Sequence, residues 1–373
     1  MPQEDIDFVV YQTATGIRVN SMGRVLRQAH IKTVSNGGMS DLTGIVDRSI
    51  RLAYADLLFG TEIRAVDNQG VFYRGRADQQ AGQLTQTSEN IQMTWLNTSA
   101  EDQNTDPITV TNGTSIEAAF GQVFNSTWTP LIGSNTRFVT TGNGVHADTV
   151  FTDKHPRDIA NELSKLGGSS NRPLIWGVWP DGPSFAYQAQ LAFRPITPTY
   201  QIDIRNFGGQ IGYDATAYFN RQRVRYANGV SLSTQNNFPA QSAPPVGVGY
   251  IRDGDVIQAS NITSSLDADA IGLTALTLGV QQRITSRGGL ISIPWAIRDT
   301  QGQIVPLWRV RAGTNLAING VQPVNTNYSL SRNMLYIVST DYDVDKQTLT
   351  LTFENYKQTI QGITTLLLLS QGL

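Results

Sequence analysis

Cysteine is absent from this 373-residue sequence, and histidine occurs only three times. The lack of cysteine excludes a disulfide framework and a thiol nucleophile, so stability must come from packing or from assembly. Charge is also sparse, with 16% charged residues and a formal net charge of −2, which provides no basic field to recruit nucleic acid. We expect no membrane-spanning segment, because no apolar run approaches ~18 residues. The opening MPQEDIDFVV lacks the basic and apolar regions of a signal peptide.

Motifs for catalysis are missing as well. The sequence has no G-x-S-x-G, no Walker loop and no G-x-G-x-x-G after a strand. The histidines His30, His146 and His155 have no partner at a metal-binding spacing, so we interpret each as a solvated or packed side chain. We therefore expect no catalytic, cofactor-binding or metal-binding residues, no cofactor and no enzymatic activity.

One acidic segment needs separate consideration as a calcium site. Asp341, Asp343 and Asp345 in DYDVDKQTLTLT match the first half of a calcium loop. An EF-hand would then need glycine at the position of Lys346 and glutamate at the position of Thr352, and the residues that follow read as a strand. We interpret the segment as an acidic hairpin turn.

Turn-forming and β-favouring residues are abundant, since Gly, Asn, Thr and Gln are conspicuous. The clearest pattern is a hairpin at residues 57–80, LLFGTEIRAVDNQGVFYRGRADQQ. Ile63 and Ala65 alternate with polar residues, and DNQG at residues 67–70 suits a turn that a glycine closes at positive φ. The pattern predicts a half-buried antiparallel strand pair.

Further strands and one helix follow this hairpin. ENIQMTWLN places Ile91, Met93 and Trp95 on one face of a strand. HPRDIANELSKLGG predicts a helix that starts at Pro156 and stops at Gly167. Its buried stripe should contain Ile159, Leu163 and Leu166. TYQIDIRNFGG and NRQRVRYANG return to strand-like alternation, whereas NNFPAQSAPPVGVG should be an extended connector.

The strongest helical pattern covers residues 267–287. It has a Ser or Asp cap, acids in its first turn and arginines near its end, and its buried stripe should include Ile271, Leu278 and Ile284. Four strand-like runs follow, LISIPWAIRD, QIVPLWRVRAG, NMLYIVSTDYD and QTLTLTFENY. The turn and basic strand at residues 67–76 resemble those at residues 299–311, which indicates either chance similarity or two related barrels.

The order of the segments matters more than any single motif. The sequence runs through VNSMGRVLRQAHIKTVSNGGMS, the hairpin, HPRDIANELSKLGG, RPLIWGVWPDGPSFAYQAQLAFRPITPTYQIDI, NRQRVRYANG, VPLWRVRAGTNLAI and LYIVSTDYDVDKQTLTLTFENYKQTI. This succession resembles the tail hub proteins of tailed bacteriophages, the group related to the baseplate hub of contractile-tailed phages.

The resemblance implies a mainly β fold with α+β insertions, in which two related β-barrel domains flank a laterally inserted α/β domain. The expected division is a first tube-type barrel at 1–97, a lateral α+β domain at 98–197, a second barrel from 198–235 with 289–356, a connector and helix at 236–288, and a C-terminal segment at 357–373.

The function implied by the resemblance is that of a structural ring at the tip of a phage tail. The chain would form a homotrimer that extends the tail tube and conducts DNA, which is only passing cargo. Its partners would be the distal tail protein, the tape measure protein and fibre or spike proteins. It would be located in the virion, after assembly in the host cytoplasm. Spike, fibre or lytic activity would belong to other polypeptides.

Two other readings remain open at this point. A distal tail protein that forms a hexameric ring is the alternative within phage tails. A receptor- or carbohydrate-binding protein is the other, because Trp176, Trp179 and Tyr187 could stack on sugars if they were exposed. We favour core packing of these aromatic side chains.

Overall fold

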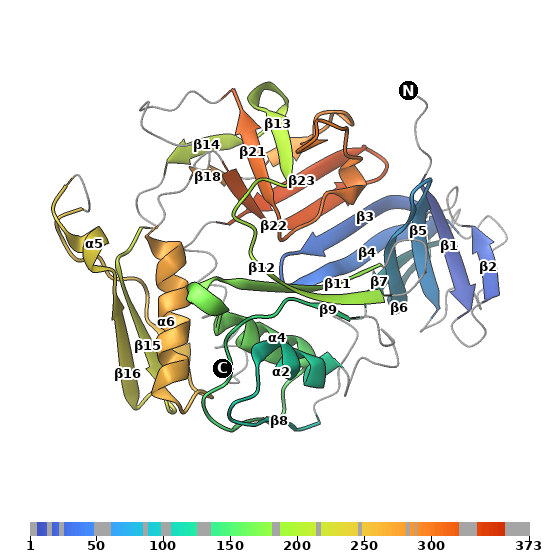
Figure 1. Cartoon of the computed structure of the whole chain (residues 1–373). Coiled ribbons are helices and arrows are strands. Elements are labelled where there is room, and N and C mark those ends of the chain that lie inside the picture. Colours follow the sequence, from blue (N-terminus) through green and yellow to red (C-terminus); the bar gives the residue numbers. More distant parts are fainter. Residues whose placement is uncertain are drawn as a thin grey trace.

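The computed structural model describes residues 6–12, 17–21, 26–47, 61–84, 89–97, 106–124, 136–180, 187–213, 218–244, 248–280, 284–287, 289–320 and 334–354. Strands dominate these residues, and three parts are visible in Figure 1: an N-terminal set of strands, a middle part with helices, and C-terminal strands above them. The described helices include none that is long and apolar enough to cross a bilayer. The expected C-terminal segment, 357–373, lies outside the described residues.

The N-terminal strands form an antiparallel sheet in the order β2-β1-β5-β6-β7-β4-β3. Their bounds are β1 (Asp7–Gln12), β2 (Ile17–Ser21), β3 (Leu26–Val34), β4 (Gly37–Asp47), β5 (Glu62–Asp67), β6 (Gly70–Leu84) and β7 (Glu89–Leu96). The predicted hairpin is confirmed as β5–β6, with Asp67 opposite Gly70 and Gly70 at φ 108°. The predicted face of β7 is confirmed too, because Ile91, Met93 and Trp95 are all buried.

The same sheet continues into the C-terminal strands. β3 pairs with β22 (Met334–Asp343), which also pairs with β23 (Thr348–Phe353) and β21 (Asn315–Asn319). Beyond β21 come β13 (Tyr200–Asp203) and β20 (Arg298–Asp299), while β19 (Gly289–Ile291) pairs with β23. The N-terminal and C-terminal strands thus share one 16-stranded sheet. The pairing among the described strands does not close a barrel.

The middle part attaches to this sheet through one hairpin. Its elements are β8 (Ile108–Val110), α2 (Ile116–Val123), β9 (Thr136–Phe138), β10 (Thr149–Phe151), α4 (Pro156–Lys165), η3 (Ser169–Asn171), β11 (Leu174–Pro180) and β12 (Tyr187–Phe193). The predicted helix α4 is confirmed, and Gly167 after it has φ +68°. β11 runs parallel to the start of β4, with Gly177 opposite Gly37 and Val178 opposite Gly38.

The remaining elements are in two places: β15 and β16 lie beside α6, whereas β14 and β18 lie by the C-terminal strands (Figure 1). They are η5 (Ile204–Asn206), β14 (Gln210–Tyr213), β15 (Arg221–Tyr226), β16 (Ser231–Asn236), α5 (Phe238–Gln241), β17 (Ile257–Ala259), α6 (Ser265–Gly279), β18 (Ile284–Arg287) and η6 (Leu307–Arg309). β15 lies between β16 and β17 in a separate three-stranded sheet. Residues 221–236 therefore pair within this sheet, which differs from the expectation that 198–235 joins the last strands.

The predicted helix at 267–287 is wrong at its C-terminal end. α6 stops at Gly279, which lies so close to Phe219 that an added Cβ would be 2.2 Å from the ring. Ile284 is the first residue of β18, whose backbone groups pair with β14. Ile271 is buried as predicted, but Leu278 is only half-buried, and Leu276 occupies the buried position with 4% exposure.

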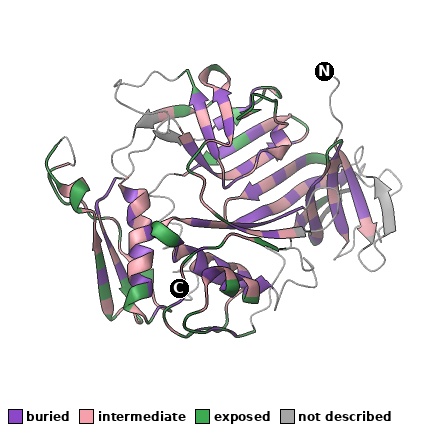
Figure 2. Ribbon diagram, viewed as in Figure 1, coloured by how far each residue is buried: buried purple, intermediate pink, exposed green. Residues whose placement is uncertain are grey.

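Two shorter predictions are also wrong. The run QIVPLWRVRAG contains the 3₁₀ turn η6 after Pro306, whose missing N–H disfavours a sheet ladder. The expected connector contains the short helix α5, which Asn237 caps by accepting a hydrogen bond from the Ala240 amide at 3.0 Å. Figure 2 shows that buried residues run along the strands and helices of every part and that exposed residues gather around α5.

Candidate functional site

The described residues contain several contacts that join segments far apart in the sequence, and these are the candidate functional features. The first lies at the turn of the β5–β6 hairpin. The carboxylate of Asp67 accepts hydrogen bonds from Trp308 Nε1 at 2.8 Å and from Arg309 Nε at 2.7 Å. Arg309 also donates to the Gly70 carbonyl at 3.2 Å. The hairpin is thereby fixed to η6, 241 residues further along the chain.

The environment of Asp67 favours the charged carboxylate. Its side chain has no exposure. Burial alone would raise the pKa of the Asp67 carboxyl, but hydrogen bonds from Arg309, Trp308 and the Gln69 amide outweigh burial and hold this pKa below its ordinary value. The hairpin prediction concerned only local structure, and no sequence pattern pointed to this docking role.

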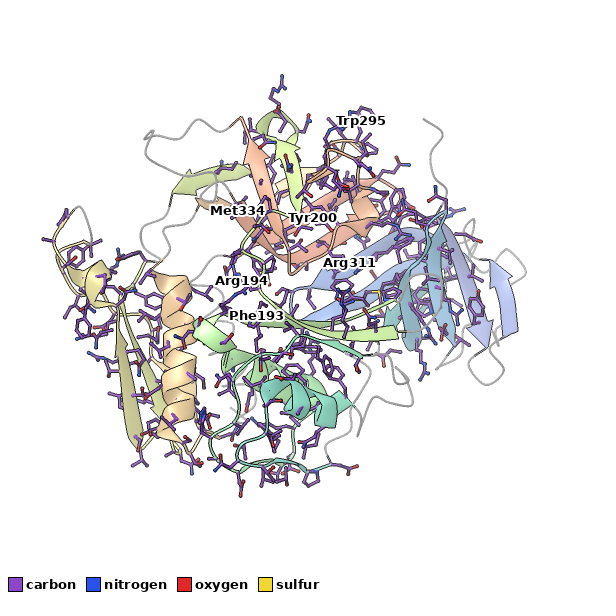
Figure 3. All side chains as sticks on the ribbon, viewed as in Figure 1. Phe193, Arg194, Tyr200, Trp295, Arg311 and Met334 are labelled. Atoms are coloured by element: carbon purple, nitrogen blue, oxygen red, sulfur yellow. The ribbon has the colours of Figure 1, made fainter. Side chains whose placement is uncertain are left out.

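A second contact joins the middle part to the C-terminal strands. Arg194, just after β12, donates to Glu354 through both terminal nitrogens, and the Nη1–Oε1 distance is 2.8 Å. The Arg194 guanidinium also lies 3.6 Å from the centre of the Tyr336 ring. Figure 3 shows Arg194 and Phe193 where the green strands meet the orange ones. A bidentate arginine–carboxylate pair that is also stacked on an aromatic ring fixes the orientation of the two side chains as well as the distance between them.

His30 and the acidic turn come together in the fold. His30 Nδ1 lies 2.9 Å from Asp341 Oδ1, and the Gln28 amide donates to Asp345 at 2.7 Å. Asp343 accepts from the Lys346 amide at 3.0 Å and from its ammonium at 2.7 Å. Asp341 and Asp343 thus lie at the end of β22 and Asp345 in the turn before β23, so the segment is part of an acidic hairpin, and it helps to hold β3 against β22. The sequence missed the pairing with His30 because the partners are 311 residues apart.

His146 makes a similar link between the middle part and α6. The buried carboxylate of Asp267 accepts from the His146 amide at 3.1 Å and lies 2.8 Å from His146 Nδ1. His155 precedes α4 as its N-cap residue, without a side-chain capping bond. Within the described ranges, no group of three or more His, Cys, Asp or Glu side chains could hold a metal ion.

The aromatic residues considered for sugar binding are buried. Trp176 and Trp179 lie in the core, and Trp176 Nε1 donates to Asn161 at 3.0 Å. The central carbon of the Arg311 guanidinium lies 4.7 Å from the centre of the Trp179 ring. The side chain of Tyr187 lies outside the described residues. Core packing is therefore confirmed for both tryptophans, which removes the motivation for a carbohydrate site there.

Comparison of sequences finds no relative. No family model matches the chain, and no curated protein is significantly similar to it in sequence.

Comparison of structures does find proteins with a similar fold. A tail protein from Neisseria meningitidis is similar over 94% of this chain and 96% of its own, with 10% identity and a TM-score of 0.58. The 43 kDa tail protein of prophage MuSo2 from Shewanella oneidensis is similar over 94% and 98%, with 9% identity and a TM-score of 0.59.

A third structural neighbour belongs to a bacterial secretion system and not to a phage. It is an E. coli protein that is a component of the type VI secretion system and is structurally similar to the T4 bacteriophage tail proteins gp27 and gp5. It is similar over 94% of this chain and 74% of its own, with 8% identity and a TM-score of 0.51. These likenesses show that the chain has the fold of phage tail proteins.

Proposed function

We propose that the chain is a structural component of a phage tail tip, a hub ring that extends the tail tube. The tail-protein fold over nearly the whole chain supports a structural role in a tail. The observation that carries the hub assignment is the pairing of β3 with β22, which joins the two ends of the chain edge to edge in one sheet. One subunit can then contribute two neighbouring segments to a ring wall.

The proposed domain division follows from this arrangement. Residues 1–97 and the C-terminal strands with β13 would be the two tube-type barrel domains, each completed in the assembly. Residues 98–197 would be the lateral domain, held by β11 on β4 and by Arg194 on Glu354. We assign residues 221–236 to the unit that contains α6, in accordance with their strand pairing.

The proposed assembly is a homotrimer in the virion. Two related domains in each of three subunits would present six similar units to a sixfold tail tube. The open edges of the sheet would be covered by neighbouring subunits, as an exposed edge strand otherwise risks uncontrolled pairing. The ring would contact the distal tail protein, the tape measure protein and fibre or spike proteins. It would pass DNA without catalysing a reaction.

The test is to determine the copy number and position of this chain in isolated tails by cryo-electron microscopy. Three copies in one ring at the tip, around an open channel, are expected. Six copies in one ring would reject the trimeric hub and favour a distal tail protein. Absence of the chain from virions would reject a structural role altogether.

A further inference from the structure

Residues 218–262, here named the outer unit, take no part in the long-range contacts that were described as candidate functional features. The unit contains β15, β16, β17 and α5, and α6 covers one face of its sheet (Figure 1). Gln222 and Val224 are fully buried on the face toward α6. Because side chains alternate along a strand, every second residue of β15, starting with its first, points to the opposite face, which the described helices leave open. These residues are Arg221, Arg223 and Arg225.

Hydrogen bonds hold the tip of the outer unit in place, and this tip exposes apolar side chains to solvent. The buried side chain of Asn220 donates to the Tyr250 carbonyl at 2.9 Å and to a carbonyl of α5 at 3.3 Å, and it accepts from the Arg252 amide at 2.8 Å. These bonds hold two chain segments together. Phe238 is 70% exposed on one of them, and Tyr250 and Ile251 are 57% and 52% exposed on the other. A fixed loop that presents two aromatic side chains to solvent is typical of a binding surface.

The composition of the outer unit indicates a protein partner. Residues 218–262 contain four arginines but no lysine and no glutamate. Protein interfaces are enriched in arginine and aromatic residues and depleted of lysine and glutamate. Leu232, on β16 beside the arginines, is 53% exposed and adds apolar area to the open face.

The net charges of the outer unit and of the remaining residues indicate that the protein partner is a second copy of this chain. The four arginines oppose two aspartates, so the outer unit carries +2, whereas the whole chain carries −2. The remaining residues therefore carry −4. Part of this negative charge is on the surface, because Asp148, Asp153 and Asp158 of the middle part are exposed. The residues of a second copy outside its outer unit thus carry a net negative charge, which is complementary to the positive charge of the outer unit.

We propose that the outer unit is the surface through which each copy of this chain binds a neighbouring copy, outside residues 218–262 of that neighbour. This inference rests on the proposed ring function and names the residues that close the ring. Contact between two outer units is disfavoured because both are positive. A contact between two different surfaces repeats from copy to copy and closes into a ring when the rotation allows it.

Site-specific cross-linking tests the inference in the assembled state. The chain has no cysteine, so Phe238→Cys provides a single attachment point for a benzophenone maleimide. Ile196→Cys is the matched control, since Ile196 is 71% exposed and Phe238 is 70% exposed. In tails isolated from particles that carry each variant, irradiation of the label at 238 should give a product of twice 40.8 kDa. The cross-linked peptide should lie outside residues 218–262, and the control should give several-fold less product.

A charge reversal gives an independent measurement on the purified chain. Arg225→Glu should weaken self-association at least tenfold in sedimentation equilibrium, and added salt should weaken association of the unaltered chain. Arg205→Glu is the control, because its side chain is 85% exposed outside the outer unit. Circular dichroism should show that both variants keep the fold.

Four results would overturn the inference. They are cross-linking of position 238 to a different protein, cross-linking between two outer units, unchanged association of Arg225→Glu, and a three-copy ring without a cross-link at position 238. A three-copy ring in which position 238 forms no cross-link would reject this interface and leave the proposed function intact. Absence of the ring itself would reject both, and the copy number measured in tails separates the two cases.

Discussion

Asp67 and Arg309 form an ion pair across 242 residues of sequence, and this pair fixes the turn of the β5–β6 hairpin to η6. The Asp67 side chain is fully buried and Arg309 is only 20% exposed. Trp308 donates a further hydrogen bond to the same carboxylate. The contact therefore couples the N-terminal strands to the segment that precedes β21, and its loss should be measurable in the isolated chain.

The first prediction is that Asp67→Asn destabilises the chain by about 3 kcal/mol, because removing one charge of a buried pair leaves the other without compensation. Urea unfolding followed by tryptophan fluorescence at pH 7 measures the difference. Asp203→Asn is the control, since Asp203 pairs with the exposed Arg205, and it should leave the midpoint unchanged. Equal midpoints for Asp67→Asn and the unaltered chain would show that the pair does not contribute.

The second prediction concerns the pH dependence of this contact. Because the pKa of Asp67 is lowered in the folded chain, its contribution to the free energy of unfolding is complete above the ordinary aspartate pKa of about 4. It decreases as pH falls through the lowered pKa. The stability difference between the unaltered chain and Asp67→Asn should thus be constant from pH 5 to 7 and shrink toward pH 3. A difference that grows on acidification would contradict the assigned direction.

The third prediction distinguishes two leucines of α6. Leu276 is 4% exposed, so Leu276→Ala should cost about 2–5 kcal/mol through lost burial and the cavity that remains. Leu278 is half-buried, and Leu278→Ala should cost about 1 kcal/mol or less. Denaturant unfolding of both variants gives the comparison. The opposite order would place the buried stripe on the face that the sequence predicted.

Local patterns account for what the sequence predicted correctly. The hairpin turn at Gly70, the buried face of β7 and the helix α4 each depend on residues within about one element, where periodicity and capping operate. The end of α6 was missed because its cause is distant: Phe219 packs against Gly279, and β14 supplies partners for β18. The turn η6 differs from the expected strand for a local reason, the missing N–H of Pro306, whereas its docking on Asp67 depends on a distant part of the chain.

The candidate contacts were harder to predict than the fold. Each joins residues that the sequence separates widely, such as Arg194 with Glu354 and His146 with Asp267. No spacing rule relates such partners, because only the folded sheet brings them together. The arginines of β15 form an alternating pattern in the sequence, but only the position of α6 in the fold shows which face of the sheet they occupy.

The last prediction tests how the middle part is attached to the main sheet. Gly38 and Gly113 share the same backbone torsion, φ +83°, so alanine introduces similar strain at both positions. They differ in their surroundings. An added Cβ at Gly38 would lie 2.5 Å from the backbone nitrogen of Val178 in β11, whereas at Gly113 it would meet nothing within 4 Å.

Gly113→Ala should therefore cost about 1–2 kcal/mol, the strain of a left-handed alanine. Gly38→Ala should cost about 2–3 kcal/mol more, because β11 must move away from β4 to relieve the overlap. Denaturant unfolding gives both free energies, and limited proteolysis of the folded variants should show faster cleavage in the middle part for Gly38→Ala alone. Similar losses for the two variants would mean that β11 can shift on β4 without cost, and that this close approach does not hold the middle part in place.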